Sequence, residues 1–205
     1  MFNDKYHLNK DVLSGDKTMT RRLAKDRALN LIVGNYGLKN IEITKETIGD
    51  NISFKITEKN SPKIIGIISP KYNLTQILGI AQSYKDINYD GIYSWNTNVT
   101  EPTRSPGYTN KMFVRGELMP HQIMITDVRL ERLQDISDED CLKEGIRPLT
   151  KDGSLIKFGT MDGMDWSKMP DNPKDAFAML IDSTSGKGTW DFNPLVFVYN
   201  FKLIK

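Results

Sequence analysis

This sequence has little of what defines several common classes of protein. Cys141 is the single cysteine among 205 residues, so no internal disulfide can form and the fold does not depend on an oxidising compartment. The two histidines, His7 and His121, stand alone, and no Cys/His cluster has metal-ligand spacing. No apolar run reaches the roughly 18 residues of a membrane-spanning helix, and the first residues lack an apolar segment of signal-peptide length. We therefore expect a cytoplasmic protein that is not inserted in a membrane and uses no metal or cofactor.

The charge is nearly balanced, which speaks against broad binding to nucleic acid. Lys plus Arg is 28 and Asp plus Glu is 26, a net charge of +2, whereas a DNA-binding protein would show a strongly basic face. No DNA partner is expected. Residues 1–30, however, carry seven cations and four aspartates, more net positive charge than the whole chain. A local basic site near the beginning of the sequence is therefore compatible with the composition.

The periodicity of the apolar residues predicts many strands and few helices. One domain spanning 1–205 is the expected organisation for this length. Strands are predicted at 41–44, 51–57, 63–69, 76–84, 121–133 and 195–204, and short helices at 8–14, 137–145 and from 172 onwards, where Asn172 precedes Pro173 at the helix start. A turn at Gly49 could join the first two strands as a hairpin, and the strand at 121–133 alternates strictly. In the last strand, one face should belong to the core: Phe197, Tyr199, Phe201 and Leu203. Strands and helices do not alternate regularly. We therefore expect an α+β fold, a small and mainly antiparallel β-barrel with short flanking helices and long inserted loops.

The stretch from Gly15 to Arg22 concentrates groups that can bind an anion or activate a nucleophile. Gly15 lies where the first helix should end, a position that favours a left-handed backbone. Lys17 and Thr20 follow, together with two guanidinium groups, and a lysine near a hydroxyl can serve as its base. The alternative is a helix C-terminus whose cations only complement the helix dipole.

A second candidate feature is the acidic helix at 137–145. Ser137 is the predicted N-cap, and Asp140 completes a capping box with acids in the first turn. Glu144 is the last helical residue before Gly145. A Glu at such a position is commonly solvated, and this reading stays open beside a functional one.

Read together, these two stretches resemble a known family. The spacing Gly15-x-Lys17-x-x-Thr20-x-Arg22 is similar to the GxKxxTxR signature of the ASCH domain family, and the segment ending at Glu144 resembles the acidic helix that closes on Glu-Gly. The resemblance implies a PUA-like β-barrel. This chain is longer than the small enzymes of the family, with insertions near 23–69, 85–110 and 147–172.

One branch of that family hydrolyses N4-acetylcytidine to cytidine and acetate. The resemblance implies that Lys17 is the proton acceptor, Thr20 the nucleophile and Glu144 the proton donor. Lys17 could act as a base only if its pKa is lowered, by desolvation or by nearby arginines. Arg22 could stabilise an oxyanion or hold a backbone carbonyl, and Gly15, Arg21 and Arg22 are the predicted ligand-binding residues. Arg21 could instead be a surface cation.

The expected partner is a small nucleoside or RNA, and the alternative function is a non-catalytic RNA-binding PUA-like module. Other conspicuous residues have simpler readings. Cys141 is interpreted as a small core residue and His121 as structural, while Trp166 and Trp190 either anchor packing or floor a base pocket. Aromatics in the loop at 85–110 could form a stacking wall or pin the loop to the domain.

Overall fold

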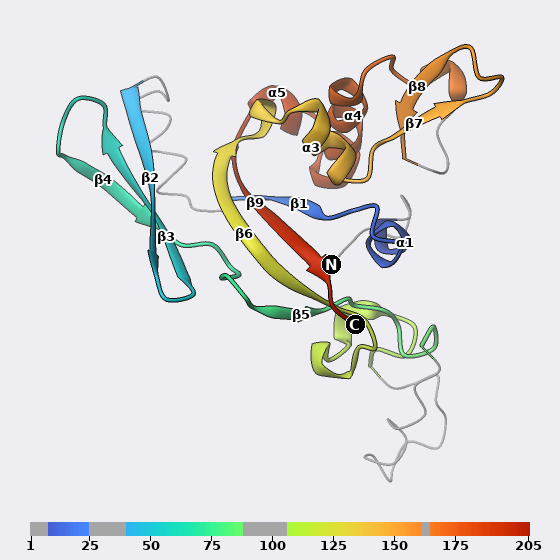
Figure 1. The fold of residues 1–205 in the computed structure, drawn as a ribbon, viewed down its shortest axis with the longest axis horizontal. Coiled ribbons are helices and arrows are strands. Elements are labelled where there is room, and N and C mark those ends of the chain that lie inside the picture. The colour runs from blue at the N-terminus through green and yellow to red at the C-terminus, as the bar shows by residue number, and fades with distance from the viewer. Residues whose placement is uncertain (1–7, 25–39, 88–105, 161–164) are drawn as a thin grey trace, which may run out of the picture.

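A curled antiparallel sheet forms the centre of the molecule (Figure 1). The computed structural model describes residues 8–24, 40–87, 106–160 and 165–205. The four strands run in the order β1-β9-β6-β5, and every neighbouring pair is antiparallel. They are β1 (Met19–Leu23), β5 (Ile77–Gly79), β6 (Gln122–Arg132) and β9 (Leu195–Leu203). The sheet bends around its inner face as a half-barrel.

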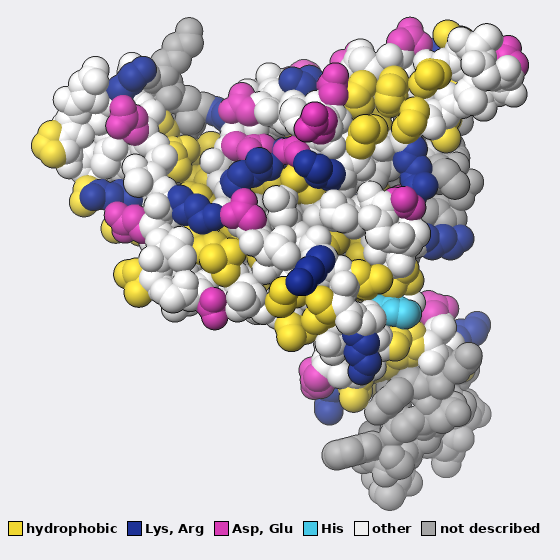
Figure 2. Space-filling model, viewed as in Figure 1, with side chains coloured by type: hydrophobic (Ala, Val, Ile, Leu, Met, Phe, Trp, Pro, Cys, Tyr) yellow, Lys and Arg dark blue, Asp and Glu magenta, His cyan; other side chains and the backbone are white. Residues whose placement is uncertain are grey.

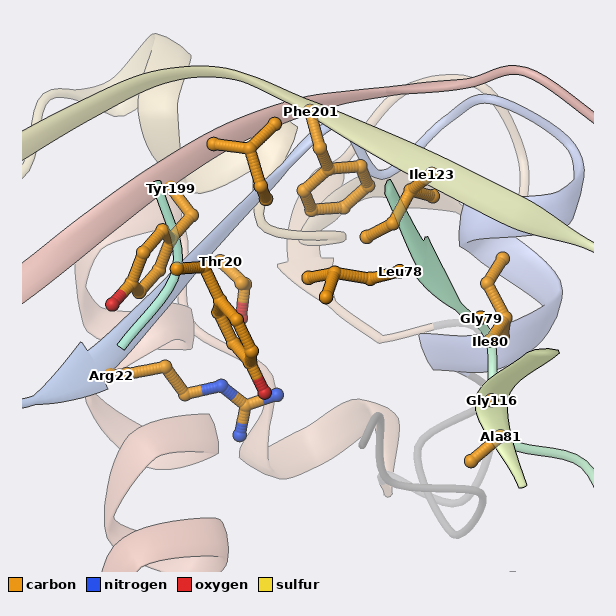
Figure 3. Close-up of a pocket in the computed structure, with 12 residues that line it drawn as sticks. Thr20, Arg22, Leu78, Gly79, Ile80, Ala81, Gly116, Ile123, Tyr199 and Phe201 are labelled. Atoms are coloured by element: carbon orange, nitrogen blue, oxygen red, sulfur yellow. The ribbon is translucent and has the colours of Figure 1, made fainter. Parts of the chain in front are cut away.

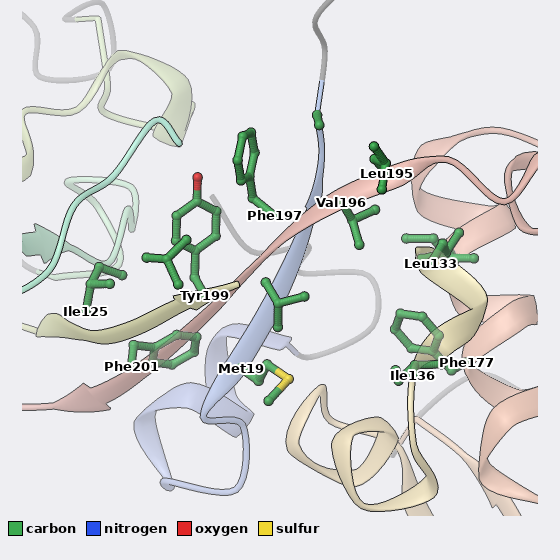
Figure 4. Close-up of a cluster of buried hydrophobic side chains, with 14 of the residues drawn as sticks. Met19, Ile125, Leu133, Ile136, Phe177, Leu195, Val196, Phe197, Tyr199 and Phe201 are labelled. Atoms are coloured by element: carbon green, nitrogen blue, oxygen red, sulfur yellow. The ribbon is translucent and has the colours of Figure 1, made fainter. Parts of the chain in front are cut away.

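Strand β9 lies inside this sheet and is buried on both faces. All five residues from Leu195 to Tyr199 are buried, because β1 and β6 cover its edges and side chains pack above and below it. Figure 4 shows Phe197 and Tyr199 projecting from one face of the strand and Val196 from the other. The predicted strand is confirmed, but the expectation that Leu203 belongs to the core is wrong, since it is 38% exposed near the end of the chain.

A separate three-stranded sheet packs against the half-barrel. It consists of β2 (Ile41–Ile48), β3 (Asn51–Glu58) and β4 (Ile64–Ile68), in that order. The predicted hairpin is confirmed, with Gly49 in the left-handed conformation at its turn. Alternate residues of β3 are buried, and the ring of Phe54 lies 5.9 Å from that of Phe197 in the half-barrel. Part of the predicted insertion 23–69 is therefore ordered sheet, while 25–39 lies outside the described residues.

The long strand β6 departs from the strict alternation expected of it. The register against β9 shifts between Ile125 and Asp127, as in a β-bulge. Ile125 and Val128 are therefore both buried, although the uninterrupted pattern puts them on opposite faces. The bulge bends the strand and contributes to the curvature of the sheet.

Short helices cover one end of the sheet. They are α3 (Asp138–Lys143), α4 (Pro173–Ser185) and α5 (Thr189–Phe192), and α1 (Leu8–Leu13) lies beside the end of β1 (Figure 1). Ser137 caps α3 by accepting a hydrogen bond from the Asp140 amide, as predicted. Asn172 caps α4 in the same way, and Pro173 occupies its first turn. Phe177 of α4 lies on the same side as Met19 and Ile136 in Figure 4, so these helices close the core on the outer face of the sheet.

Some predicted boundaries are wrong. The strand expected at 76–84 is reduced to the three residues of β5, and the irregular segment 147–172 contains the hairpin β7 (Arg147–Thr150) and β8 (Ile156–Gly159). Single turns of 3-10 helix occur at Lys111–Phe113, Gly116–Leu118, Leu133–Asp135 and Trp166–Lys168. Within the predicted loop 85–110, residues 88–105 lie outside the described part.

The fold is thus a mixed α+β structure with mostly antiparallel strands, as the sequence predicts at that level. Over the described residues, no helix is long and apolar enough to cross a bilayer.

Candidate functional site

The loop between α1 and β1 is held at both ends by backbone hydrogen bonds. Gly15 ends the helix with φ +82°, the left-handed conformation expected of it. The amide of Lys17 then donates to the carbonyl of Asp11 at 2.8 Å, and the amide of Thr18 to the carbonyl of Lys143 at 3.0 Å. The loop is therefore fastened to α1 and to the last turn of α3, which brings the two candidate sequence features together.

Lys17 and Glu144 form a buried ion pair across 127 residues of sequence. The Lys17 Nζ lies 2.7 Å from Glu144 Oε2 and also donates to the Glu144 carbonyl. Lys17 is 2% exposed and Glu144 4%, so the interpretation of Glu144 as a solvated helix end is wrong. Gly145 permits this approach, because a Cβ there would lie 3.3 Å from both Asp11 and Leu8 on a backbone with φ +102°.

Burial lowers the pKa of the Lys17 ammonium, which is the condition the sequence set for a basic role. The Glu144 carboxylate opposes this shift because it stabilises the charged form, and the charge of Arg22 reinforces it. Desolvation is the main cause of the shift. The same carboxylate that brings Lys17 into place also works against its deprotonation.

Arg21 is buried, and three carboxylates surround it. Its Nη2 lies 2.6 Å from Glu131 Oε1 and 3.1 Å from Asp140 Oδ2, and its Nη1 lies 3.3 Å from Glu144 Oε1. Burial alone would lower the pKa of the guanidinium, but these anions raise it above its usual value. The alternative reading of Arg21 as a surface cation is wrong, since the side chain links β1, β6 and α3 in the interior.

A second arginine stabilises the same acidic group from the surface. Arg129 Nη2 donates to Asp140 Oδ2 at 2.8 Å. Burial raises the pKa of Asp140, but the hydrogen bonds from Arg129 and Arg21 outweigh it, and the pKa lies below its ordinary value. The carboxylates around Arg21 are therefore part of a compensated network. No sequence pattern pointed to the partners Glu131 and Arg129, which lie on β6.

Arg147 fastens the loop from the other side, a role that sequence reasoning also missed. Its Nη2 lies 2.7 Å from Asp11 Oδ1 and 2.6 Å from Asp16 Oδ2. Burial raises the pKa of Asp11, and Arg147 counteracts the shift. Asp16 occupies a variable position of the signature, and only the fold brings Arg147 to it.

Thr20 and Arg22 face a different space. Because successive residues of a strand point to opposite sides, Met19 and Arg21 enter the core while Thr20 and Arg22 face the inner side of the half-barrel. There they line a cavity of about 210 Å³. In Figure 3, Tyr199, Thr20 and Arg22 lie along one side of it, and Leu78, Gly79, Ile80 and Gly116 along the other. Among the described residues that line the cavity, neither Lys17 nor Glu144 is present.

Two tyrosines give this cavity an aromatic wall. Tyr199 pairs with Thr20 across β9 and β1, and its ring packs edge-on against Tyr72 at 5.5 Å. The Tyr199 hydroxyl accepts a hydrogen bond from the Lys71 amide at 3.1 Å, and burial raises the pKa of this phenol. The sequence identified Tyr199 only as a core residue. The strand pairing that makes it a neighbour of Thr20 was not available from the sequence.

A close backbone contact forms the opposite wall. A Cβ on Gly79 would lie 2.2 Å from the carbonyl oxygen of Gly116, so only glycine allows β5 to approach that turn. Both glycines line the cavity. Its far side is therefore set by backbone and cannot be filled by a side chain from position 79.

The remaining candidates are structural where the fold describes them. Cys141 is fully buried, and burial raises the pKa of its thiol to about 12. The Trp190 ring packs edge-on against Phe177 at 6.3 Å, and the Lys151 ammonium lies 5.3 Å from the Trp166 ring. Neither tryptophan lines the cavity of Thr20. In the described ranges, no group of His, Cys, Asp and Glu has the arrangement of a metal site.

No family model, curated protein or solved structure matches this chain.

Proposed function

We propose that this chain is an ASCH-type domain with a PUA-like barrel that binds a nucleobase or nucleoside beside Thr20 and Arg22. The observation that carries the proposal is the cavity itself. Two residues of the GxKxxTxR-like stretch line it together with the aromatic wall of Tyr72 and Tyr199. Ligand pockets of this kind combine apolar walls with a few polar groups that fix orientation. The half-barrel of antiparallel strands supports the same proposal.

Binding is tested by calorimetric titration of the protein with cytidine and N4-acetylcytidine. Thr20→Val keeps the volume of the side chain but removes the hydroxyl from the cavity, so we expect weaker binding or none. Thr47→Val, on the exposed surface of β2, is the matched control and should bind as the unmodified protein does. If the unmodified protein binds neither compound, the proposed function is wrong.

A second candidate function is hydrolysis of an N4-acetylcytidine-like amide, favoured by the contact between Lys17 and Glu144. In the reaction that the resemblance implies, the Thr20 oxygen would attack the acyl carbon and lose its proton to Lys17, although Thr20 lines the cavity and Lys17 does not. The C–N bond would break, the cytosine amino group would take a proton from Glu144, the donor that the resemblance implies, and water would then release acetate from the threonine ester. The lowered pKa of Lys17 supports a basic role, although its ammonium donates to Glu144.

Thr20→Val gives the clearest test of catalysis, because Lys17 and Glu144 are buried and their removal would also damage the fold. Cytidine released from N4-acetylcytidine is measured by chromatography. We expect release by the unmodified protein and by Thr47→Val, and none by Thr20→Val. Equal release by all three proteins would exclude Thr20 as the nucleophile.

A non-catalytic RNA-binding role makes a different prediction. Affinity for an oligonucleotide would fall steeply with salt, because phosphate contacts release counterions. The face seen in Figure 2 gives this alternative little support, since its cations are interleaved with acids and do not form a continuous basic surface.

A further inference from the structure

The described residues that line the cavity include a single charged side chain. Arg22 is the one charged side chain among the described residues that line it, and no carboxylate is among them. The neighbouring Arg21 has three carboxylates within 3.3 Å. Of these two adjacent arginines, Arg21 therefore lies among acids in the interior and Arg22 lines the cavity.

The charge of Arg22 acts on the groups around the cavity. It lowers the pKa of Tyr199, against the larger opposing effect of burial, and that of Lys17. A second cation borders the same wall. The Lys71 ammonium lies 5.3 Å from the centre of the Tyr72 ring, and the Lys71 amide donates to Tyr199. A ligand with its ring against the tyrosines would therefore have positive charge beside it.

The size of the cavity limits what can enter. At about 210 Å³ it is smaller than the roughly 300 Å³ at which pockets for drug-sized ligands begin. It suits a single ring, and the rest of a larger ligand must extend outside. Arg22 is exposed and lies at the side of the cavity, within reach of such an extension (Figure 3). A guanidinium binds phosphate oxygens through paired hydrogen bonds, which a neutral sugar cannot match.

We propose that the cavity is a site for a nucleoside monophosphate, with the base against Tyr72 and Tyr199 and the phosphate on Arg22. The inference rests on the proposed function and narrows it from neutral nucleosides to free mononucleotides. Thr20 then contacts the base or its substituent. Lys71 contributes to the positive potential at the mouth of the site.

Calorimetric titrations with cytidine 5′-monophosphate and with cytidine test this assignment. We expect the monophosphate to bind at least about tenfold more tightly, the effect of one charge-assisted hydrogen bond or more. Arg22→Gln should remove that advantage, so that the variant binds the monophosphate no more tightly than it binds cytidine. Lys59→Gln, which removes one positive charge from the exposed end of the hairpin β2–β3, should keep the advantage.

The possible outcomes separate this inference from the function on which it rests. Equal affinities for monophosphate and nucleoside, unaffected by Arg22→Gln, overturn the inference and leave nucleoside binding intact. Binding of inorganic phosphate as tight as that of the mononucleotide overturns it as well, because the base then contributes nothing. Binding of a 5′-phosphorylated trinucleotide without binding of the mononucleotide assigns the site to an RNA end. Binding of neither cytidine nor its monophosphate rejects both proposals.

Discussion

At the scale of single residues, the most informative difference is that between Arg21 and Arg22, of which the first is buried and the second exposed. Arg21 is 5% exposed and holds Glu131, Asp140 and Glu144 together, whereas Arg22 is exposed beside the cavity. The sequence grouped both as ligand-binding residues because it records order and not direction. A contact between Arg21 and a ligand stays a prediction. The structure shows that Arg21 forms an ion pair with Glu144.

This difference predicts unequal effects on stability. Arg21→Gln leaves buried carboxylates without their cation and should reduce the free energy of unfolding by about 3–5 kcal/mol. Arg22→Gln should change it by less than about 0.5 kcal/mol, as is usual at exposed positions. Urea unfolding of both variants measures this. Similar losses in the two would show that the buried network contributes little.

Cys141 provides a prediction about reactivity. With a pKa of about 12, its thiol is about one part in ten thousand ionised at pH 8, and it is also fully buried. We expect no labelling by a thiol reagent in the native protein and one equivalent after denaturation. Rapid labelling of the native protein would contradict its position in the core.

At the scale of elements, the contact of β5 with the turn at Gly116 forms one wall of the cavity. Gly79→Ala would force a methyl group against the Gly116 carbonyl, at a distance of 2.2 Å, so backbone must move. We expect a loss of about 1–3 kcal/mol in stability, as for other overpacked sites, together with weaker ligand binding.

Gly116→Ala is the matched variant on the other side of the same contact. A Cβ there would meet its nearest neighbour, the Gly79 amide, at 3.9 Å, an ordinary distance. It should therefore unfold as the unmodified protein does. An equal loss in both variants would show that the close approach is not what holds β5.

The helices, turns and strands also show which structural features short sequence patterns can predict. Local signals predicted the helix caps at Ser137 and Asn172 and the turn at Gly49, because each depends on a few neighbouring residues. The bulge at Ile125 in β6 and the hairpin β7–β8 were missed. The first depends on pairing with a distant strand, and the second lies in a segment without clear alternation.

The residues of the candidate site also fall into two groups, those that the sequence predicted and those that it did not. Lys17 and Glu144 were predicted to belong together, from a resemblance, and they are in contact. Tyr72, Gly79 and Gly116 were not predicted, because they reach the cavity through long-range packing that leaves no local pattern. Thr20 was expected beside Lys17, and the alternation of β1 turns it to the cavity.

At the scale of the whole molecule, the ion network connects β1, β6 and α3 and should make stability depend on pH. The pKa of Asp140 is lowered in the folded protein from its ordinary 3.8, so the ionised form favours folding. This contribution is present above pH 3.8 and is lost as the pH falls through the lower native pKa.

Asp140→Asn cannot titrate, so its deficit in stability should be largest near neutral pH and shrink below pH 3.8. Asp138→Asn, on the exposed side of the same helix, should show a much smaller dependence. Unfolding curves between pH 7 and pH 3 give the comparison. A deficit that does not change with pH would show that hydrogen-bond geometry, and not charge, is what Asp140 supplies.

The alternation of β1 has a consequence for how this chain can change over time. Substitutions at positions 20 and 22 change the lining of the cavity without loss of the core, whereas positions 19 and 21 are constrained by packing and charge. A saturation scan scored for folding should therefore show a tolerance that rises and falls every second residue. An insertion of one residue at the start of the strand would turn every following side chain to the opposite face. The Arg21 guanidinium would then face the cavity, and Thr20 would face the core. We therefore expect a change in the length of this five-residue strand to be tolerated less well than substitutions at positions 20 and 22.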